Sequence, residues 1–340
     1  MKNNRLLCVC LPVLCLIFSC SSDKDKQKPD ISKINISTKI QRFDQDLLTF
    51  DTNNVTKSFE ILKNKYSTGF LDIFIHKILL DEQNPRTSDE KVIEGFAKFP
   101  GVRKILDTCQ IVFGDAADLE RDFSKSFKYY KYYFPQKPTP QVISFVSEYG
   151  LGAFTYGDST LAVGLDFFLG ENYAPYEAIF PNYIRRSLNK QHLVSKSIEA
   201  IANDLVGQPA GNRLLDIMMR NGKAMYVKDL FLPDTPDSIK LEYSGQQVKW
   251  CLENEKNIWD YFMSENLLYS VKMDDIGKLV GPSPNAPGMP ADAPGRTANW
   301  IGLQIIKSFM RQNPSVSLAQ LLPIRDAQSL LDRSKYKPKR

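Results

Sequence analysis

Residues 191–230 constrain the fold more than any other part of the chain, because they predict two long helices with a short break between them. Gly207, Pro209 and Gly211 mark the break, since glycine and proline interrupt helices. On each side, apolar residues recur at the spacing of one helix face. These residues are Val194, Ile198, Ile201 and Leu205 in the first helix and Leu214, Met218, Gly222 and Met225 in the second. We expect the rest of the chain to pack around these two helices.

Gly222 is an unusual occupant of the apolar face of the second helix. Glycine destabilises a helix interior by roughly 1 kcal/mol relative to alanine, so its presence there needs a structural reason. It predicts either a close approach by another backbone or a ligand, or the end of the helix.

The first 20 residues have the pattern of a bacterial export signal. A short basic start precedes an apolar run over residues 6–18, which is shorter than the roughly 20 residues that a membrane-spanning helix needs. The run ends in Ile-Phe-Ser-Cys, which resembles the lipobox of bacterial lipoproteins. We therefore expect a signal peptide over residues 1–19, acyl chains such as palmitate on Cys20, and a flexible tether over residues 20–33. Such a chain would be anchored to a membrane without spanning it.

Charge and cysteine content limit the partners and the cross-links. Removal of residues 1–19 takes away Lys2 and Arg5, so the formal net charge falls from +5 to +3. A nearly neutral, exported chain is not expected to bind nucleic acid. Cys109 and Cys251 are the cysteines left after Cys20. Each lies in an apolar helical pattern that favours a buried free thiol, but the sequence does not decide whether they pair.

The remaining pattern predicts a mainly helical α+β fold with a single globular domain over residues 34–340. We expect an N-terminal helical lobe at 34–135, a small sheet and the central helices at 141–232, and C-terminal helices at 246–334. Residues 281–296 contain five prolines and predict a long loop, of the kind that often forms a lid or a binding site.

The expected strands and helices follow from local patterns. Three short, β-branched or aromatic segments separated by glycine turns predict a small antiparallel sheet, at 141–146, 153–156 and 160–165, and residues 34–40 predict a first strand. Helices outside the central pair are expected at 44–65, 70–80, 88–99, 102–113, 115–134, 246–266 and 299–312, with a short one from Ser317.

The chain lacks the motifs of several common enzyme classes. His76 and His192 are its two histidines, so no helix can carry the H-E-x-x-H motif of a zinc hydrolase. No G-x-S-x-G motif and no phosphate-binding loop is present. Residues 187–190 match S-x-x-K, but the K-T-G partner motif is missing. No carboxylate pair stands out for a glycosidase, although such a pair is defined in three dimensions. We expect no cofactor.

Several short segments, in order along nearly the whole chain, together resemble one family. They are the lipobox cysteine, Arg42-Phe43-Asp44, Tyr132-Tyr133-Phe134-Pro135, GKAMYVKDLFLP at 222–233, ENLLYS at 265–270, PGRTANWIGLQII at 294–306 and SKYKPK at 334–339. On these segments the chain is identified as a member of the GldB family of gliding-motility lipoproteins. The resemblance implies a place in the cell envelope of a Bacteroidetes-type bacterium, with its gliding and secretion machinery.

The central segment is also similar to a family of predicted zinc peptidases that carry H-E-x-x-H on the first helix and a third ligand on the second. Ile198 and Ala202 stand at the histidine positions, Glu199 at the general-base position and Asn221 at the third-ligand position. The resemblance implies a zincin-like scaffold that has lost its metal ligands and keeps a cleft. Lys196 lies three residues before Glu199, so a solvent-facing ion pair between the two also explains that carboxylate.

These observations lead to two functional hypotheses. The first is a non-catalytic envelope lipoprotein that faces the periplasm or the cell surface and binds another envelope protein or a glycan. Its candidate groove residues are Glu199, Asn221, Tyr226, Arg296 and Trp300, since an arginine can bind a carboxylate and a tryptophan can stack on a sugar. The second is a peptidase-like hydrolase with Glu199 as general base. We expect the first, with no catalytic residue and no metal.

Overall fold

A computed structural model of the chain describes residues 28–79 and 87–339. The expected signal peptide and Cys20 lie outside these residues. The chain divides after Asp30 into two units, and the unit that begins at Ile31 contains all the described helices and strands. In the first unit, the described residues 28–30 form neither.

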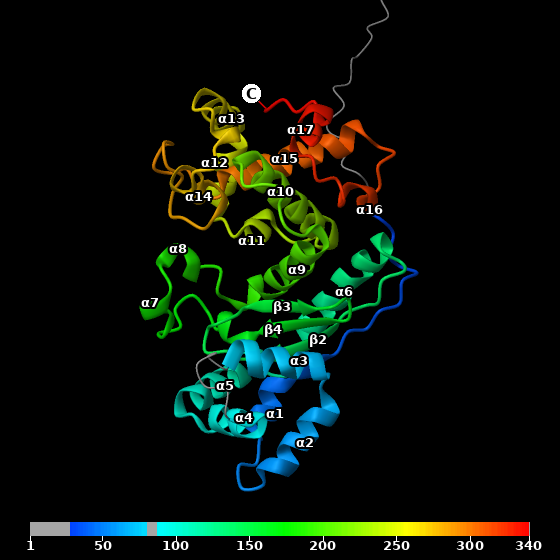
Figure 1. Cartoon of the computed structure of the whole chain (residues 1–340), viewed down its shortest axis with the longest axis vertical. Coiled ribbons are helices and arrows are strands. Elements are labelled where there is room, and N and C mark those ends of the chain that lie inside the picture. Colours follow the sequence, from blue (N-terminus) through cyan, green and yellow to red (C-terminus); the bar gives the residue numbers. More distant parts are fainter. Residues whose placement is uncertain (1–27, 80–86, 340) are drawn as a thin grey trace, which may run out of the picture. The chain divides into compact units, whose positions relative to one another are not determined.

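The unit from Ile31 onward is mainly helical with a small sheet (Figure 1). Its strands are β1 (Ile40–Arg42), β2 (Gln141–Phe145), β3 (Ala153–Tyr156) and β4 (Thr160–Gly164). The helices before and beside the sheet are α1 (Phe43–Leu48), α2 (Val55–Lys65), α3 (Thr68–Ile73), α4 (Asp89–Lys98), α5 (Pro100–Phe113), α6 (Ala117–Tyr133), α7 (Tyr176–Ile179) and α8 (Asn182–Arg185). The central and C-terminal helices are α9 (Lys190–Val206), α10 (Leu214–Phe231), α11 (Asp237–Leu241), α12 (Gly245–Glu253), α13 (Glu255–Ser264), α14 (Met273–Val280), α15 (Thr297–Gln312), α16 (Leu318–Leu321) and α17 (Ala327–Ser334).

The sheet is mixed, with the strand order β1-β2-β4-β3. The strands predicted at 141–146, 153–156 and 160–165 are confirmed, but the predicted antiparallel arrangement holds only for β3 and β4. Both β1 and β4 run parallel to β2. The chain passes from β1 to β2 through α1 to α6, and a crossover of this kind joins parallel strands. Strand β4 then lies between β2 and β3, so β2 and β3 form no hairpin.

The predicted first strand at 34–40 is wrong, because pairing with β2 begins only at Ile40. The segment before it is held by side chains of α6. The Thr38 N–H donates to Ser124 Oγ at 2.8 Å, and the Ile40 N–H donates to Glu120 Oε1 at 3.1 Å. These side chains satisfy backbone groups that a sheet neighbour would otherwise have to pair.

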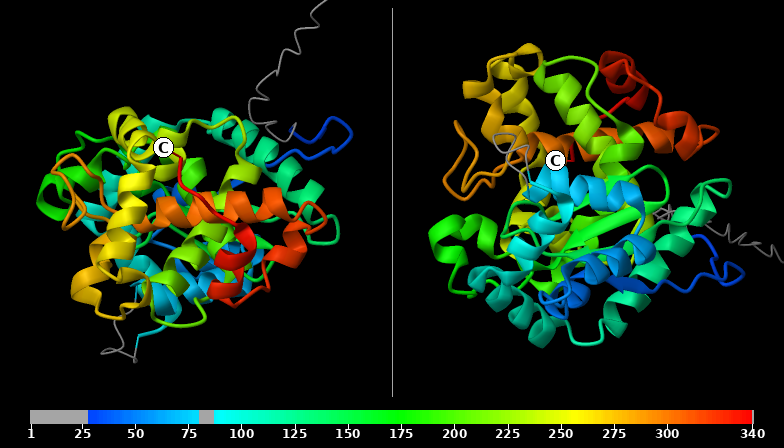
Figure 2. Two further views of the ribbon diagram at one scale, coloured as in Figure 1. Left: turned by 90° about the horizontal axis from the view of Figure 1, so that it is seen from above. Right: turned by 60° about the horizontal axis from the view of Figure 1, so that its bottom comes forward.

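The sheet lies between the N-terminal helices and the central helix α9 (Figure 1 and Figure 2). Helix α9 packs on β3 and β4. The N-terminal helices add an aromatic cluster that includes rings from the sheet: Phe74 lies 6.1 Å from Phe145 of β2, and Phe70 lies 6.3 Å from Phe154 of β3, between ring centroids. Because both faces are covered, β2 is buried from Val142 onward and β4 is buried throughout.

The two central helices are confirmed, and the structure explains Gly222. A Cβ atom on Gly222 would lie 2.3 Å from the carbonyl carbon of Gly302, and one on Gly302 would lie 2.1 Å from the Met218 oxygen. The backbones of α10 and α15 therefore touch where they cross. Helix α10 continues to Phe231, so of the two predicted reasons for this glycine the close approach is right and the helix end is wrong.

Two predicted long helices are each divided in two, while the helices predicted at 88–99, 102–113, 115–134 and 299–312 are confirmed. The helix expected at 44–65 is interrupted at residues 49–54, where Asp51 accepts the Asn53 N–H at 2.9 Å and stabilises a turn. The helix expected at 246–266 breaks at Asn254. The helix expected at 70–80 continues α3 as a π-helix, Phe74–Leu79. Residues 281–296 form the expected long loop.

Cys109 of α5 and Cys251 of α12 are both buried free thiols. Burial, the largest influence, raises the pKa of each, to about 12 for Cys251. Because both thiols are free, the two cysteines form no disulfide with each other.

Candidate functional site

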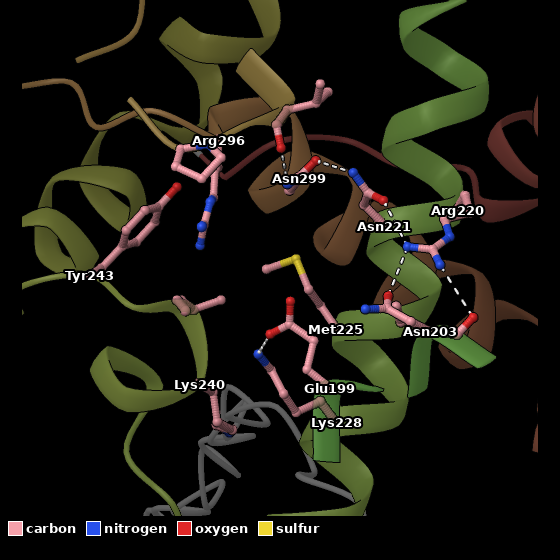
Figure 3. Close-up of a pocket in the computed structure, with 14 residues that line it drawn as sticks. Glu199, Asn203, Arg220, Asn221, Met225, Lys228, Lys240, Tyr243, Arg296 and Asn299 are labelled. Atoms are coloured by element: carbon pink, nitrogen blue, oxygen red, sulfur yellow. Dashed lines mark hydrogen bonds and ion pairs between the residues drawn. The ribbon is translucent and has the colours of Figure 1, made fainter. Parts of the chain in front are cut away.

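A pocket of about 240 Å³ lies between α9, α10, the end of α11 and the segment that enters α15 (Figure 3). Charged and amide side chains make up most of its wall. The lining residues are Glu199, Asn203, Arg220, Asn221, Ala224, Met225, Lys228, Lys240, Leu241, Tyr243, Val280, Pro282, Arg296 and Asn299.

Three of the five groove residues expected from the sequence line this pocket, namely Glu199, Asn221 and Arg296. The other two do not. Tyr226 and Trp300 are 8% and 3% exposed, and both belong to the hydrophobic core. The indole nitrogen of Trp300 is buried without a hydrogen-bond partner in the described chain. The sugar-stacking role expected for Trp300 therefore has no counterpart in this pocket.

Two helices supply half of the lining residues because the residues that face the pocket recur four positions apart. Glu199 and Asn203 share one face of α9, while Arg220, Ala224 and Lys228 share one face of α10. This spacing is visible in the sequence, where it runs beside the apolar face. It was the available signal for Asn203, Arg220 and Lys228, which the sequence analysis missed.

The Glu199 carboxylate is held by Lys228. Lys228 Nζ donates to Glu199 Oε2 at 2.5 Å, while the other carboxylate oxygen points into the cavity (Figure 3). Lys228 is almost fully buried, and the Glu199 side chain is 39% exposed. Burial opposes ionisation of Glu199, but the attraction of Lys228 outweighs it, so the pKa of this carboxyl lies below its usual value. The solvent-facing pair expected between Lys196 and Glu199 is wrong.

Lys196 instead pairs with Glu242, a residue that the sequence analysis did not select. Lys196 Nζ lies 2.8 Å from Glu242 Oε1, and Arg296 Nη1 lies 3.3 Å from Glu242 Oε2. The Glu242 side chain is 7% exposed. Although burial opposes ionisation, Lys196 and Arg296 hold the pKa of this carboxyl far below its usual range. Glu242 follows α11 in a turn with no periodic pattern, so nothing in the sequence marks it.

Glu242 and Arg296 also share an uncommon backbone conformation. Their φ angles are +56° and +63°, in the left-handed region that side chains other than glycine rarely adopt. Each such residue costs of order 1 kcal/mol, and residues of this kind occur often at binding sites. The ion pair between them therefore joins two strained positions at the edge of the pocket.

Arg220 stands at the opposite wall in a network of neutral oxygens. Its guanidinium donates to the Gly207 carbonyl at 2.7 Å and to the Asn203 side chain at 2.8 Å, with a longer bond of 3.3 Å to Asn221. Asn221 in turn donates to Asn299 at 2.9 Å (Figure 3). In the described chain Arg220 has no carboxylate partner within ion-pair distance, and burial lowers its pKa.

The positions that correspond to the peptidase motif are divided between the core and the pocket. Ile198 and Ala202 are fully buried, whereas Glu199 and Asn221 line the cavity. Residues 28–79 and 87–339 contain no group of three or more histidine, cysteine, aspartate or glutamate side chains placed to hold a metal ion. A general base works best with a pKa near the working pH, and Glu199 is shifted away from it.

A second cavity, of about 590 Å³, lies between α6, α9 and residues 231–236. Its rim carries two ion pairs, Lys190 with Asp118 at 2.9 Å and Lys125 with Asp234 at 2.8 Å. The side chains of these pairs are 33–55% exposed, whereas Glu242, Lys228 and Lys240 at the first pocket are at most 8% exposed. The burial of its ionisable groups favours the first pocket as the functional site.

Comparison with known proteins supports the family expected from the sequence. The family model described as "Gliding motility protein GldB" matches residues 24–338. The chain therefore belongs to this family. No curated protein and no solved structure matches it significantly. In the described residues, no helix has the length and apolar character needed to cross a membrane. The expected likeness to a zincin-like scaffold stays a prediction.

Proposed function

We propose that this member of the GldB family is a non-catalytic lipoprotein of the cell envelope that binds an envelope protein or glycan in the pocket between α9 and α10. The lipid would be attached to Cys20 after removal of residues 1–19. Family membership supports the envelope location and a role in gliding motility.

Two ion pairs at the pocket, each with one almost fully buried partner, carry this proposal. Removing charges from water costs several kcal/mol per ion, and a well-packed apolar pair would often be more stable. Here Glu199 with Lys228 and Glu242 with Arg296 lie at a cavity, and both residues of the second pair have left-handed backbones. Such a costly arrangement is best explained if the charges recognise a ligand.

The alternative is a peptidase-like hydrolase with Glu199 as general base. A zincin-like scaffold that has lost its metal would account for the position of Glu199 and Asn221 in one pocket. The Lys228 ion pair argues against the base, because it keeps Glu199 ionised and weakly basic.

Photo-crosslinking in the living envelope tests the binding role. A photoreactive residue at Met225, inside the pocket, is expected to give a discrete adduct, whereas one at the exposed Lys104 of α5 is expected to give none. Glu199→Lys should abolish the Met225 adduct, since it reverses the charge beside Lys228. An adduct that persists in this variant would contradict the proposal.

The hydrolase is tested on the purified chain. Near-stoichiometric zinc by elemental mass spectrometry, together with cleavage of a peptide or glycan that Glu199→Gln abolishes, would replace binding by catalysis. We expect neither result.

A further inference from the structure

The pocket wall carries more positive than negative charge. Four of its lining residues are cations, and three of these have carboxylate partners: Lys228 pairs with Glu199, Arg296 with Glu242, and Lys240 with Asp229 and Asp237. The fourth, Arg220, is held by neutral oxygens only among the described residues. Glu242 is moreover shared with Lys196. An anionic group would therefore be attracted to this cavity.

The pocket also keeps hydrogen-bonding groups for a ligand. Arg296 uses Nη1 for Glu242, and its other guanidinium nitrogens make no hydrogen bond within the described chain. The side-chain amide nitrogen of Asn203 likewise has no described acceptor. It points toward the cavity, as does the carboxylate oxygen of Glu199 that Lys228 leaves free (Figure 3). The wall thus offers a guanidinium and an amide as donors and a carboxylate as acceptor.

This combination matches the end of a peptide chain. A guanidinium binds a carboxylate in a planar, often bidentate geometry, while Asn203 and Glu199 can pair with the carbonyl and the N–H of an adjacent peptide group. A sugar fits this wall less well. Trp300 is buried outside the pocket and cannot stack on a sugar ring, and the Tyr243 hydroxyl already donates to the Gly295 carbonyl. The volume of about 240 Å³ admits a chain end but no folded segment.

We propose that the pocket binds the free C-terminal carboxylate of a peptide or protein, with the carboxylate on Arg296 and the last peptide group between Asn203 and Glu199. This assignment rests on the proposed function and names the ligand class of the same site.

Isothermal titration of the full chain in detergent tests it with three millimolar probes. N-acetyl-Ala-Ala with a free carboxylate is expected to bind. The same peptide as a C-terminal amide is expected to bind at least tenfold more weakly. Glucuronic acid, a carboxylate carried by a sugar, is expected not to bind.

Asn203→Asp is the sharpest variant, because it places a carboxylate beside Arg220 and so supplies that cation with a partner while it repels the ligand. The fold should be retained, which circular dichroism and thermal unfolding check. Affinity for N-acetyl-Ala-Ala should fall at least tenfold. Asn257→Asp, the same change at an exposed site on α13, should leave it unchanged.

The outcomes separate the two proposals. Equal binding of acid and amide, binding of neither, or an unchanged affinity in Asn203→Asp would overturn the C-terminal assignment, and preferential binding of glucuronic acid would replace the peptide by a glycan. In each of these cases, a Met225 crosslink that Glu199→Lys abolishes would leave the binding role standing. Peptide binding without such a crosslink would instead overturn the envelope partner of the proposed function, because the pocket would then hold a chain end only in vitro.

Discussion

Glu242 binds two cations from different elements, and its removal should show how much the pocket depends on it. Glu242→Gln leaves Lys196 and Arg296 without their shared carboxylate. Breaking a buried ion pair on one side costs about 3–5 kcal/mol, so we expect a loss of this order in the free energy of unfolding, measured with urea. Glu253→Gln, where the side chain is 61% exposed, should change it by less than about 0.5 kcal/mol. A loss as small as that of the control would disprove the role given to Glu242.

Asp166, two residues after the end of β4, should make stability depend on pH. It is fully buried, and one oxygen accepts the Ser147 and Tyr149 N–H groups at 2.9 and 2.7 Å while the other has no described partner. Burial, only partly offset by these N–H groups, raises the pKa of Asp166 to about 6. Because the folded pKa exceeds the unfolded value, protonation favours the fold. Its contribution is complete below about pH 4 and is lost as the pH rises through 6.

Asp166→Asn should therefore remove a pH dependence. Between pH 7 and pH 4 the natural chain should gain about 2 kcal/mol of unfolding free energy relative to this variant, since each pKa unit corresponds to about 1.4 kcal/mol and the unfolded carboxyl is still partly ionised at pH 4. Urea midpoints at several pH values measure the difference. Parallel curves for the two proteins would show that Asp166 does not titrate as described.

At the residue scale the sequence indicated half of each ion pair. Glu199 and Arg296 were selected from the sequence, but their partners Lys228 and Glu242 were not. A residue's partner across the fold depends on how its helix is rotated and docked, which local spacing does not determine. The expected pair between Lys196 and Glu199 was wrong for the same reason. A neighbour three residues away on the helix attracts Lys196 less than the buried carboxylate of Glu242 from another element does.

At the scale of elements, the crossing of α10 and α15 depends on two glycines. Gly222→Ala and Gly302→Ala would each force a methyl group into backbone atoms less than 2.5 Å away. Each should lower the free energy of unfolding by about 1–3 kcal/mol or more, as overpacking does. Thermal and urea unfolding measure the change.

Gly95→Ala is the matched control, since Gly95 lies in α4 with nothing within 4 Å of an added Cβ. There alanine should stabilise by about 0.5–1 kcal/mol through helix propensity alone. The same sign of change at positions 95 and 222 would contradict the close crossing.

Periodicity predicted most helices and strands, and it failed where short-range chemistry or strand order decides. The turn at Asp51 and the break at Asn254 depend on single polar residues inside otherwise helical patterns. The mixed sheet was not predictable, because the composition of short strands such as β2 and β4 does not show whether they run parallel or antiparallel. The long crossover from β1 accounts for the parallel pair β1 and β2, whereas the pair β2 and β4 is parallel because β3, antiparallel to β4, lies between them in the chain.

For the whole unit from Ile31 onward, the two buried thiols provide a test of cooperativity. Cys109 lies in the N-terminal lobe and Cys251 among the C-terminal helices, and both belong to one compact unit. We expect neither to react with a thiol reagent in the native state and both to react at the same urea midpoint. Mass spectrometry of the two cysteine peptides follows each separately. Distinct midpoints would show that the lobes unfold independently.

The contact between Gly222 and Gly302 also determines how the pocket can respond to a ligand. Asn221 and Asn299 flank this contact and bond across it, so two sides of the cavity are fixed by backbones that have no room to slide. A wall of this kind has little freedom to lose on binding, which favours affinity, but it cannot reshape itself around a poor fit. The site would therefore be selective for one ligand geometry, and variation among ligands would be tolerated only in the part that lies outside the cavity.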